Sequence, residues 1–145
     1  MKRGIVKSAL AAALLVTGGA VLQAQAQEDA IDCANAQTQA ELNSCAYQDF
    51  EKADKELNRV YRKALKKQEE VDREVADMGP NYVGAVKALK KAQRAWIDFR
   101  DGHCEGVGFE ARGGSMEPML VSGCMAQLTL ERTKQLRELI KSAGD

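Results

Sequence analysis

The sequence predicts an all-α fold, a small antiparallel bundle of three main helices with two disulfides. Three observations lead to this prediction. Apolar residues recur every three or four positions along three long stretches, as on one face of a helix. No stretch shows the alternation of apolar and polar residues that is typical of a half-buried strand. The chain also holds four cysteines, enough for two bridges between or within those helices.

The first 26 residues are expected to be a cleaved secretory signal and not part of the fold. Three basic residues within the first seven precede an apolar run from 8 to 22, and Ala24-Gln25-Ala26 follows. A basic start, a short apolar region and a small-residue cleavage site are typical of such a signal. The apolar run is shorter than the ~20 residues that a membrane span needs. We therefore expect residues 27–145 to form one helical domain that is periplasmic or secreted and not inserted in a membrane.

The overall charge argues against nucleic acid and anionic membranes as partners. Removing the signal would take three basic residues from a chain with 21 basic and 21 acidic residues, which leaves 18 − 21 = −3. A mildly acidic protein is repelled by polyanions at long range and is compatible with a basic protein partner. The charge balance therefore favours protein binding over binding to nucleic acid.

All four cysteines lie beyond the expected signal, so export would place them where disulfides persist. Sequence alone allows three ways of pairing them. They fall into an early pair and a late pair separated by a long helical stretch, which favours Cys33 with Cys45 and Cys104 with Cys124. No zinc or other metal site is expected, because the chain has no Cys-x-x-Cys pair and one histidine.

The first helix is predicted to begin at Thr38 and to continue to about Met78. Thr38-Gln39-Ala40-Glu41 has the form of a capping box, in which the Thr and Glu side chains each accept a backbone N–H. Gly79-Pro80 ends the pattern. A helix of ~40 residues spans ~60 Å, so a bend or a frayed section is expected within the charged run 66–77. The predicted apolar face holds Leu42, Cys45, Ala46, Phe50, Ala53, Leu57, Val60, Tyr61, Ala64 and Leu65.

The second helix is predicted to run from about Asn81 or Tyr82 to Arg100. Asp101-Gly102 is expected to end it, because glycine is a common stop signal after a periodic segment. Lysines and other charged residues fill the remaining faces, as on a solvated side. The predicted apolar face holds Val83, Val86, Leu89, Ala92 or Gln93, Trp96 and Ile97.

The third helix is predicted to start at about Met119 or Val121 and to reach the end of the chain. Lys141 suits the negative end of the helix dipole, and Gly144 lies where the helix should stop. The predicted inner side holds Val121, Met125, Leu128, Arg132, Leu136, Leu139 and Ile140. Three such apolar stripes would pack together as one bundle.

The segment between the last two cysteines is predicted to be an exposed loop tied at both ends. Glycine punctuates residues 103–118, and no helical period continues through them. A tethered loop loses less entropy on binding than a free one, so it suits insertion into the cleft of a partner. An ordinary surface connection is the equally weighted alternative. The candidate partner-binding residues are Glu105, Phe109, Glu110, Gly113, Gly114, Ser115 and Glu117.

Several polar residues fall on or beside the apolar stripes, and two interpretations are open. They fix the helix register and hold the inner end of the loop by hydrogen bonds, or they line a ligand pocket. The first is favoured, because small helical bundles with satisfied polar cores need no ligand. Arg100 with Asp101 is expected to form either a local ion pair or a hydrogen bond at the helix end. The residues concerned are Asn43, Asp54, Asn58, Gln93, Arg100 and Arg132.

The residue inventory argues against an enzyme. His103 is the only histidine, and it is followed by a cysteine that is expected to be oxidised, so a nucleophile-histidine pair is disfavoured. Acidic residues at helical spacing are usually a solvated face and not a catalytic pair. Gly113-Gly114-Ser115 lacks the Lys of a phosphate-binding loop. No cofactor is expected, and a hydrolase is the least favoured function.

The chain resembles the LprI-type domain, a family named for a mycobacterial lysozyme inhibitor. The resemblance covers nearly all of the expected exported part. Its motifs are Asp32-Cys33, Thr38 to Ala46, Ala53-Asp54, Leu57-Asn58 with Tyr61, Gln93-Arg94-Ala95-Trp96, Arg100-Asp101 with Cys104, and Gly113-Gly114-Ser115 with Cys124. The residues that we carry over as a structural motif are Asp54, Asn58, Tyr61, Gln93, Trp96, Arg100 and Asp101.

The resemblance implies a secreted, disulfide-bonded helical domain and, for the founding member, inhibition of lysozyme. This chain lacks the lipid-attachment cysteine of that founding type, so a soluble periplasmic form is expected. The hypothesis is therefore an inhibitor that binds lysozyme or another cell-wall hydrolase and occludes its cleft. The alternative is a non-catalytic scaffold module of the envelope that binds another protein through the charged run 66–77 or a helix face.

Overall fold

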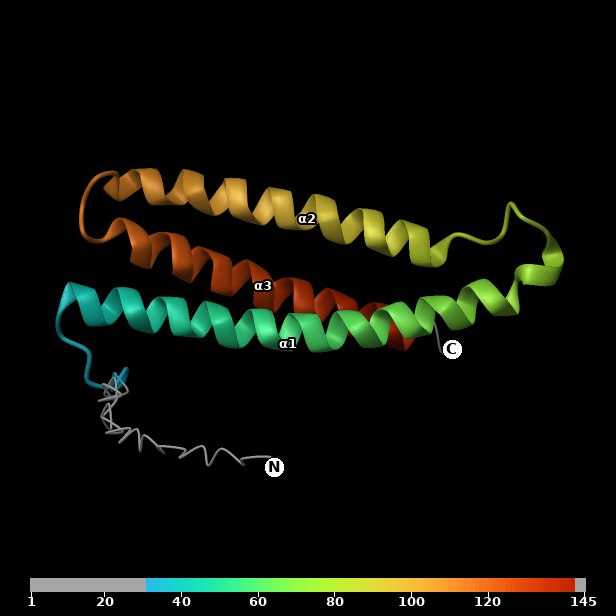
Figure 1. The fold of residues 1–145 in the computed structure, drawn as a ribbon, viewed down its shortest axis with the longest axis horizontal. Coiled ribbons are helices and arrows are strands. Elements are labelled where there is room, and N and C mark those ends of the chain that lie inside the picture. Colours follow the sequence, from blue (N-terminus) through green and yellow to red (C-terminus); the bar gives the residue numbers. More distant parts are fainter. Residues whose placement is uncertain (1–30, 143–145) are drawn as a thin grey trace, which may run out of the picture.

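The computed structural model describes residues 31–142, which form three long α-helices and two short 3-10 helices. Figure 1 shows α1 and α3 side by side and running in the same direction, while α2 returns antiparallel to both. No strand occurs within residues 31–142, so the all-α prediction is confirmed. The elements are α1 (Gln39–Glu74), η1 (Ala76–Met78), α2 (Ala85–Gly108), η2 (Phe109–Ala111) and α3 (Glu117–Ser142).

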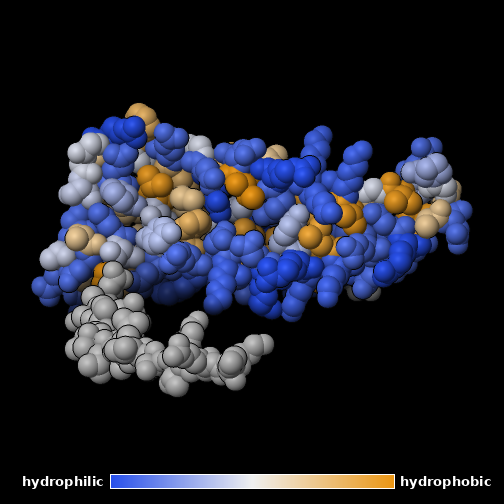
Figure 2. Space-filling view, viewed as in Figure 1, coloured by the Kyte–Doolittle hydropathy of each residue, from blue (hydrophilic) through white to orange (hydrophobic). Residues whose placement is uncertain are grey.

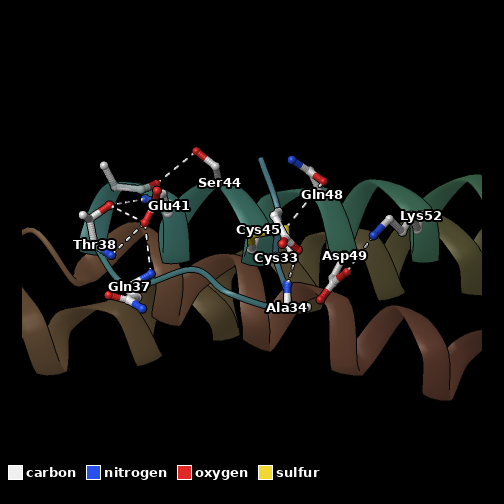
Figure 3. The surroundings of a disulfide bond; sticks show 12 residues. Cys33, Ala34, Gln37, Thr38, Glu41, Ser44, Cys45, Gln48, Asp49 and Lys52 are labelled. Atoms are coloured by element: carbon white, nitrogen blue, oxygen red, sulfur yellow. Dashed lines mark hydrogen bonds and ion pairs between the residues drawn. A yellow bond between two sulfur atoms is a disulfide. The ribbon is translucent and has the colours of Figure 1, made fainter. Parts of the chain in front are cut away.

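The start of α1 is fixed by its predicted capping box and by the first disulfide (Figure 3). Thr38 Oγ1 accepts the N–H of Glu41 at 3.2 Å, and the Glu41 carboxylate accepts the N–H of Thr38 at 2.8 Å. The bond from the N–H of Thr38, and a second from the N–H of Gln37 at 3.0 Å, hold the pKa of Glu41 below its usual range. The bridge from Cys33 to Cys45, with Cα atoms 5.6 Å apart, ties the preceding segment to the second turn of the helix.

α1 continues through most of the charged run and ends at Glu74, four residues before the predicted end at Met78. The expected break lies near the end of the run, where Val75 is not helical and Ala76–Met78 forms η1. The last turn of α1 also contacts the next helix. The Asp72 carboxylate accepts the backbone N–H groups of Gly84 and Ala85, both at 2.7 Å, and that of Val86 at 3.1 Å. These donors are the unpaired N–H groups at the start of α2, so the end of α1 serves as the cap of α2. They also lower the pKa of Asp72.

The prediction that Asp101-Gly102 ends α2 is wrong, because the helix continues to Gly108. Glycine within a helix costs only ~0.5–1 kcal/mol, which tertiary packing easily offsets. Cys104 is fully buried and bridged to Cys124 of α3, with Cα atoms 5.5 Å apart. Gly108 allows α3 to approach closely, since a Cβ there would lie 2.5 Å from Val121 Cγ2. Both predicted disulfides are therefore present, and the second one joins two helices.

The hydrophobic core lies in the middle of the bundle, where all three helices meet. Its fully buried members are Leu57, Val60, Ala64, Leu89 and Leu136, with Trp96 packed against them as a half-buried residue. Toward the disulfides the buried residues of α3 are small or hydroxylated, namely Ser122, Ala126, Thr129 and Thr133. The buried side of α3 is therefore shifted around the helix, from the predicted inner side to these four positions. We attribute this shift to the place of α3 against both other helices, where small side chains permit close packing.

Hydrophilic residues cover most of the face seen in Figure 2, and hydrophobic residues show only as separate patches. Within residues 31–142, no helix is both long and apolar enough to cross a membrane. The expected signal at 1–26 and the predicted helix end at Gly144 lie outside the described residues.

Candidate functional site

The connection between α2 and α3 is shorter than the predicted loop. Only residues 112–116 lie outside regular helical structure between Cys104 and Cys124. Glu105 is on α2, Phe109 and Glu110 are on η2, and Glu117 is in the first turn of α3. The prediction of a long glycine-rich loop is therefore wrong, and the candidate binding residues are presented mainly by helices. Gly113, Gly114 and Ser115 are the members that lie in the turn.

The turn is held in shape by Glu117. The Glu117 carboxylate accepts the backbone N–H of Gly113 at 2.8 Å and a guanidinium N–H of Arg112 at 2.8 Å. The bond to Gly113, and then the contact with Arg112, hold its pKa below the usual range. Gly113 has a φ of 76°, in the left-handed region that favours glycine. Glu117 thus stabilises the turn, whereas the guanidinium of Arg112 covers the ring of Phe109 at 4.4 Å.

The turn is also tied to the start of α1, across 72 residues of sequence. Asn43 Nδ2 donates to the backbone carbonyl of Ser115 at 2.9 Å, and Gln39 donates to Asn43 Oδ1 at 2.9 Å. This confirms the expectation that Asn43 holds the inner end of the connection. Together with the nearby bridge between Cys104 and Cys124, these contacts make the end of the bundle a preorganised surface.

The outer side of α2 at this end presents an exposed face that we call the α2 face. It holds two exposed aromatic rings, Phe99 at 56% and Phe109 at 55% exposure. At 100° per residue, its members on α2 lie on the half of the helix that points away from the buried positions Leu89, Gln93, Arg100 and Cys104. Phe109 and Glu110 continue the face on η2. The ring of His103 stacks on Phe99, with centroids 5.4 Å apart. The α2 face consists of Asp98, Phe99, Asp101, Gly102, Glu105, Gly106, Phe109 and Glu110, all exposed.

Two glycines of the α2 face are not required by the fold. Gly102 and Gly106 lie in the helix one turn apart, and a Cβ built at either position meets nothing within 4 Å. Neither has the positive φ that would favour glycine. Gly108, by contrast, is needed for packing against α3. Gly102 and Gly106 leave a strip of bare backbone between Phe99 and Phe109, which a partner could approach closely.

Directly beneath this face, Arg100 is buried at 7% exposure and bonded to side chains of all three helices. Its Nε donates to Asp101 at 2.8 Å, as predicted, and its Nη1 lies 3.4 Å from Asp54 Oδ1. Its guanidinium carbon lies 5.2 Å from the ring centroid of Phe50 and 5.1 Å from that of Trp96. Such cation–π contacts are stronger when desolvated. Arg100 therefore joins α2 to α1 below the exposed surface.

The other polar residues of the predicted motif also bond to one another. Arg132 Nε donates to Gln93 Oε1 at 3.1 Å, and burial lowers the pKa of Arg132. Asn58 Nδ2 donates to Asp54 Oδ2 at 2.7 Å, and Tyr61 packs against the hydrophobic core. These bonds support the structural interpretation, in which the motif fixes the register of the three helices.

Charge is strongly segregated along the bundle, although residues 31–142 carry no net charge. The disulfide end, residues 31–58 and 97–130, has 11 acidic and four basic residues, a net charge of −7. The middle, residues 59–67, 86–96 and 131–142, has 13 basic and two acidic residues, a net charge of +11. The far end, residues 68–85, has five acidic residues and one basic residue, a net charge of −4. The α2 face thus lies in an acidic region.

Neither metal nor thiol chemistry is indicated by the described part of the chain. It contains no group of three or more Cys, His, Asp and Glu side chains placed to hold a metal ion. It has no free cysteine either, because all four are in bridges.

Comparison with known proteins shows the family to which this chain is related. Residues 31–136 match the profile of the family described as lysozyme inhibitor LprI. The chain belongs to the LprI family. Among LprI-like relatives, the uncharacterized protein R02472 of Rhizobium meliloti (strain 1021) is 57% identical over 120 residues, 83% of this chain and 86% of that protein. The uncharacterized protein YecT of Escherichia coli (strain K12) is 33% identical over 108 residues, 72% of this chain and 65% of that protein. No solved structure matches this LprI-family chain.

Four residues of the α2 face of this LprI-family chain were not predicted as site residues, namely Asp98, Phe99, Gly102 and Gly106. A signal for them exists. The inner positions Trp96 and Arg100 are followed at the same spacing by Cys104 and Gly108, which extends the helical period past Asp101-Gly102. An unbroken helix would have placed Gly102, Glu105 and Gly106 on the same exposed side as Phe99, an exposed aromatic residue that merits an explanation.

Proposed function

We propose that this protein is an exported inhibitor of lysozyme or of a related cell-wall hydrolase. It binds the enzyme with the α2 face and the adjoining turn, occludes the substrate cleft and performs no chemistry of its own. Membership of the LprI family supports the class of target. The observation that carries the choice of surface is the pairing of exposed Phe99 and Phe109 with carboxylates in a region of net charge −7.

Charge supports a basic partner. Asp98, Glu105 and Glu110 are exposed, and none of them is in an ion pair within residues 31–142. Complementary charge mainly accelerates association and selects the partner, with a smaller effect on the lifetime of the complex. Inhibition should therefore weaken as salt rises, chiefly through slower association.

Apolar contact and rigidity would supply the affinity. Aromatic residues that become buried at the centre of an interface commonly contribute ~2 kcal/mol or more each. Phe99 and Phe109 lie on either side of the glycine strip, where a partner can approach the backbone of α2. The bridge between Cys104 and Cys124 and the bond from Asn43 to Ser115 hold this surface before binding, so little conformational entropy is lost when the complex forms.

The test is a titration of lysozyme activity with the purified, oxidised protein and two matched pairs of variants. Phe99→Ser with Phe109→Ser should raise the inhibition constant about 1,000-fold, which corresponds to ~4 kcal/mol for the two rings. Tyr82→Ser is the aromatic control, because Tyr82 is 60% exposed at the far end of the bundle. Glu105→Gln with Glu110→Gln should slow association, whereas Glu69→Gln with Glu74→Gln, the charge control at the far end, should not.

Two results would contradict the proposal. No inhibition by wild type at large molar excess would remove lysozyme as the target. Equal losses in the test and control variants would place the contact elsewhere. Loss of binding in the Glu69→Gln and Glu74→Gln variant alone would support the scaffold hypothesis, in which the charged run 66–77 engages the partner.

A further inference from the structure

The belt of cations around the middle of the bundle takes no part in the proposed inhibitory surface. We call it the basic belt. Its net charge of +11 is confined to residues 59–67, 86–96 and 131–142, between two acidic ends. Its cations are Arg59, Arg62, Lys63, Lys66, Lys67, Lys87, Lys90, Lys91, Arg94, Arg132, Lys134, Arg137 and Lys141. So many like charges at one level of the bundle repel one another and lower its stability. The fold itself therefore does not require them.

Part of the belt lines a groove between α1 and α3. The groove has a volume of about 230 Å³, and its apolar lining residues are Val60 and Ile140. Its other lining residues are four cations, Arg59, Lys63, Arg137 and Lys141, and no carboxylate is among them. Neither Lys63 nor Lys141 is in an ion pair within residues 31–142.

Glu56 positions the two arginines of this groove. Its carboxylate accepts Arg59 Nε at 2.7 Å and Nη2 at 2.6 Å, and it also accepts Arg137 Nη2. A guanidinium has five N–H donors, so both arginines keep donors for another acceptor. One shared carboxylate thus places a guanidinium from α1 beside one from α3. Paired guanidinium groups suit the oxygens of a phosphate, and ammonium groups add charge.

We propose that this groove binds the phosphate groups of a linear phosphate-bearing polymer that crosses the bundle at the basic belt. A polymer that runs across the bundle, perpendicular to the helices, contacts only the basic belt. A flat anionic bilayer along the molecule would also meet the two acidic ends, of net charge −7 and −4. The groove lining contains no aromatic side chain on which a base could stack, so it offers no nucleobase recognition. The near-neutral net charge concealed this local preference for a polyanion.

The probe is long-chain inorganic polyphosphate, with binding measured by calorimetry over a range of salt concentrations. Lys63→Gln with Lys141→Gln should weaken binding about tenfold and reduce the slope of log affinity against log salt by ~1.4, since each released phosphate contact contributes ~0.7. The matched control is Lys52→Gln with Lys55→Gln, which removes the same charge from exposed positions of α1 outside the basic belt. It should weaken binding no more than about twofold. Circular dichroism of both variants checks that folding is intact.

Three outcomes would overturn the proposal. The first is no binding of polyphosphate to wild type at low salt, and the second is an equal loss in the two variants. The third is binding of phosphatidylglycerol vesicles as tight, per phosphate, as that of polyphosphate, which would assign the belt to a membrane surface. Inhibition of lysozyme by the Lys63→Gln and Lys141→Gln variant should be unchanged, so failure here and failure of the proposed function are distinguishable.

Discussion

Replacing the exposed glycines of α2 by alanine should stabilise the protein. Gly102 and Gly106 are helical, and an added Cβ meets no atom within 4 Å at either position. Alanine is favoured over glycine inside a helix by ~0.5–1 kcal/mol, mainly because it restricts the unfolded chain. The double variant Gly102→Ala with Gly106→Ala should therefore gain ~1–2 kcal/mol. For a domain of this size that corresponds to a rise in Tm of roughly 4–8 °C.

Gly108→Ala is the matched control in the same helix. Its Cβ would lie 2.5 Å from Val121 Cγ2, and the stiff, branched Val side chain cannot rotate away freely. This variant should lose ~1–3 kcal/mol through overpacking between α2 and α3. Thermal and urea unfolding of the oxidised proteins measures both effects. A destabilised Gly102→Ala with Gly106→Ala variant would refute the reasoning, because it would mean that these residues are not helical or not open to solvent.

The remaining predictions concern the supports of this end of the bundle. Arg100→Met should lower the free energy of unfolding by ~2–3 kcal/mol, because two cation–π contacts and two carboxylate contacts are lost; urea unfolding measures it, and no change would contradict the buried network. Asp72→Ala should lower Tm at pH 7, because folding lowers the pKa of Asp72 and its carboxylate caps α2. The gap to wild type should begin to narrow below about pH 4, near the pKa of an unfolded Asp, and should close as the pH falls through the lowered pKa of the folded state. A gap that widens in acid would contradict this assignment. Cys104→Ala with Cys124→Ala should cost ~3 kcal/mol by the chain-entropy argument for a separation of 20 residues, and melting of the oxidised proteins tests it.

Local signals predicted the helices well where they agreed with packing. The capping box of Thr38 and Glu41 gave the start of α1, and the three-to-four spacing gave its buried face down to Ala64. The end of α2 was misjudged because Asp-Gly is only a statistical stop signal. The helix continues because Cys104 is buried and Gly108 fits closely against Val121. Both contacts involve a helix more than ten residues further along the chain.

Other features depended on contacts that no local pattern encodes. The cap of α2 by Asp72 joins groups that are 12–14 residues apart across an intervening turn. The near-zero net charge of the chain gave no indication of the basic belt. Arg59, Lys90 and Arg137 lie at the same height along the bundle only when the three helices are aligned. The α2 face emerged once the helix was extended, because the extension places Gly102, Glu105 and Gly106 on the same exposed side as Phe99.

The central claim is that the acidic α2 face, and not the basic belt, contacts the hydrolase. An NMR titration of the isotope-labelled, oxidised chain with unlabelled lysozyme tests it residue by residue. The claim predicts that chemical-shift changes and line broadening concentrate at residues 98–116, with little effect at 59–67 and 131–142. Perturbations centred on the belt or on the charged run 66–77, with 98–116 unaffected, would contradict it.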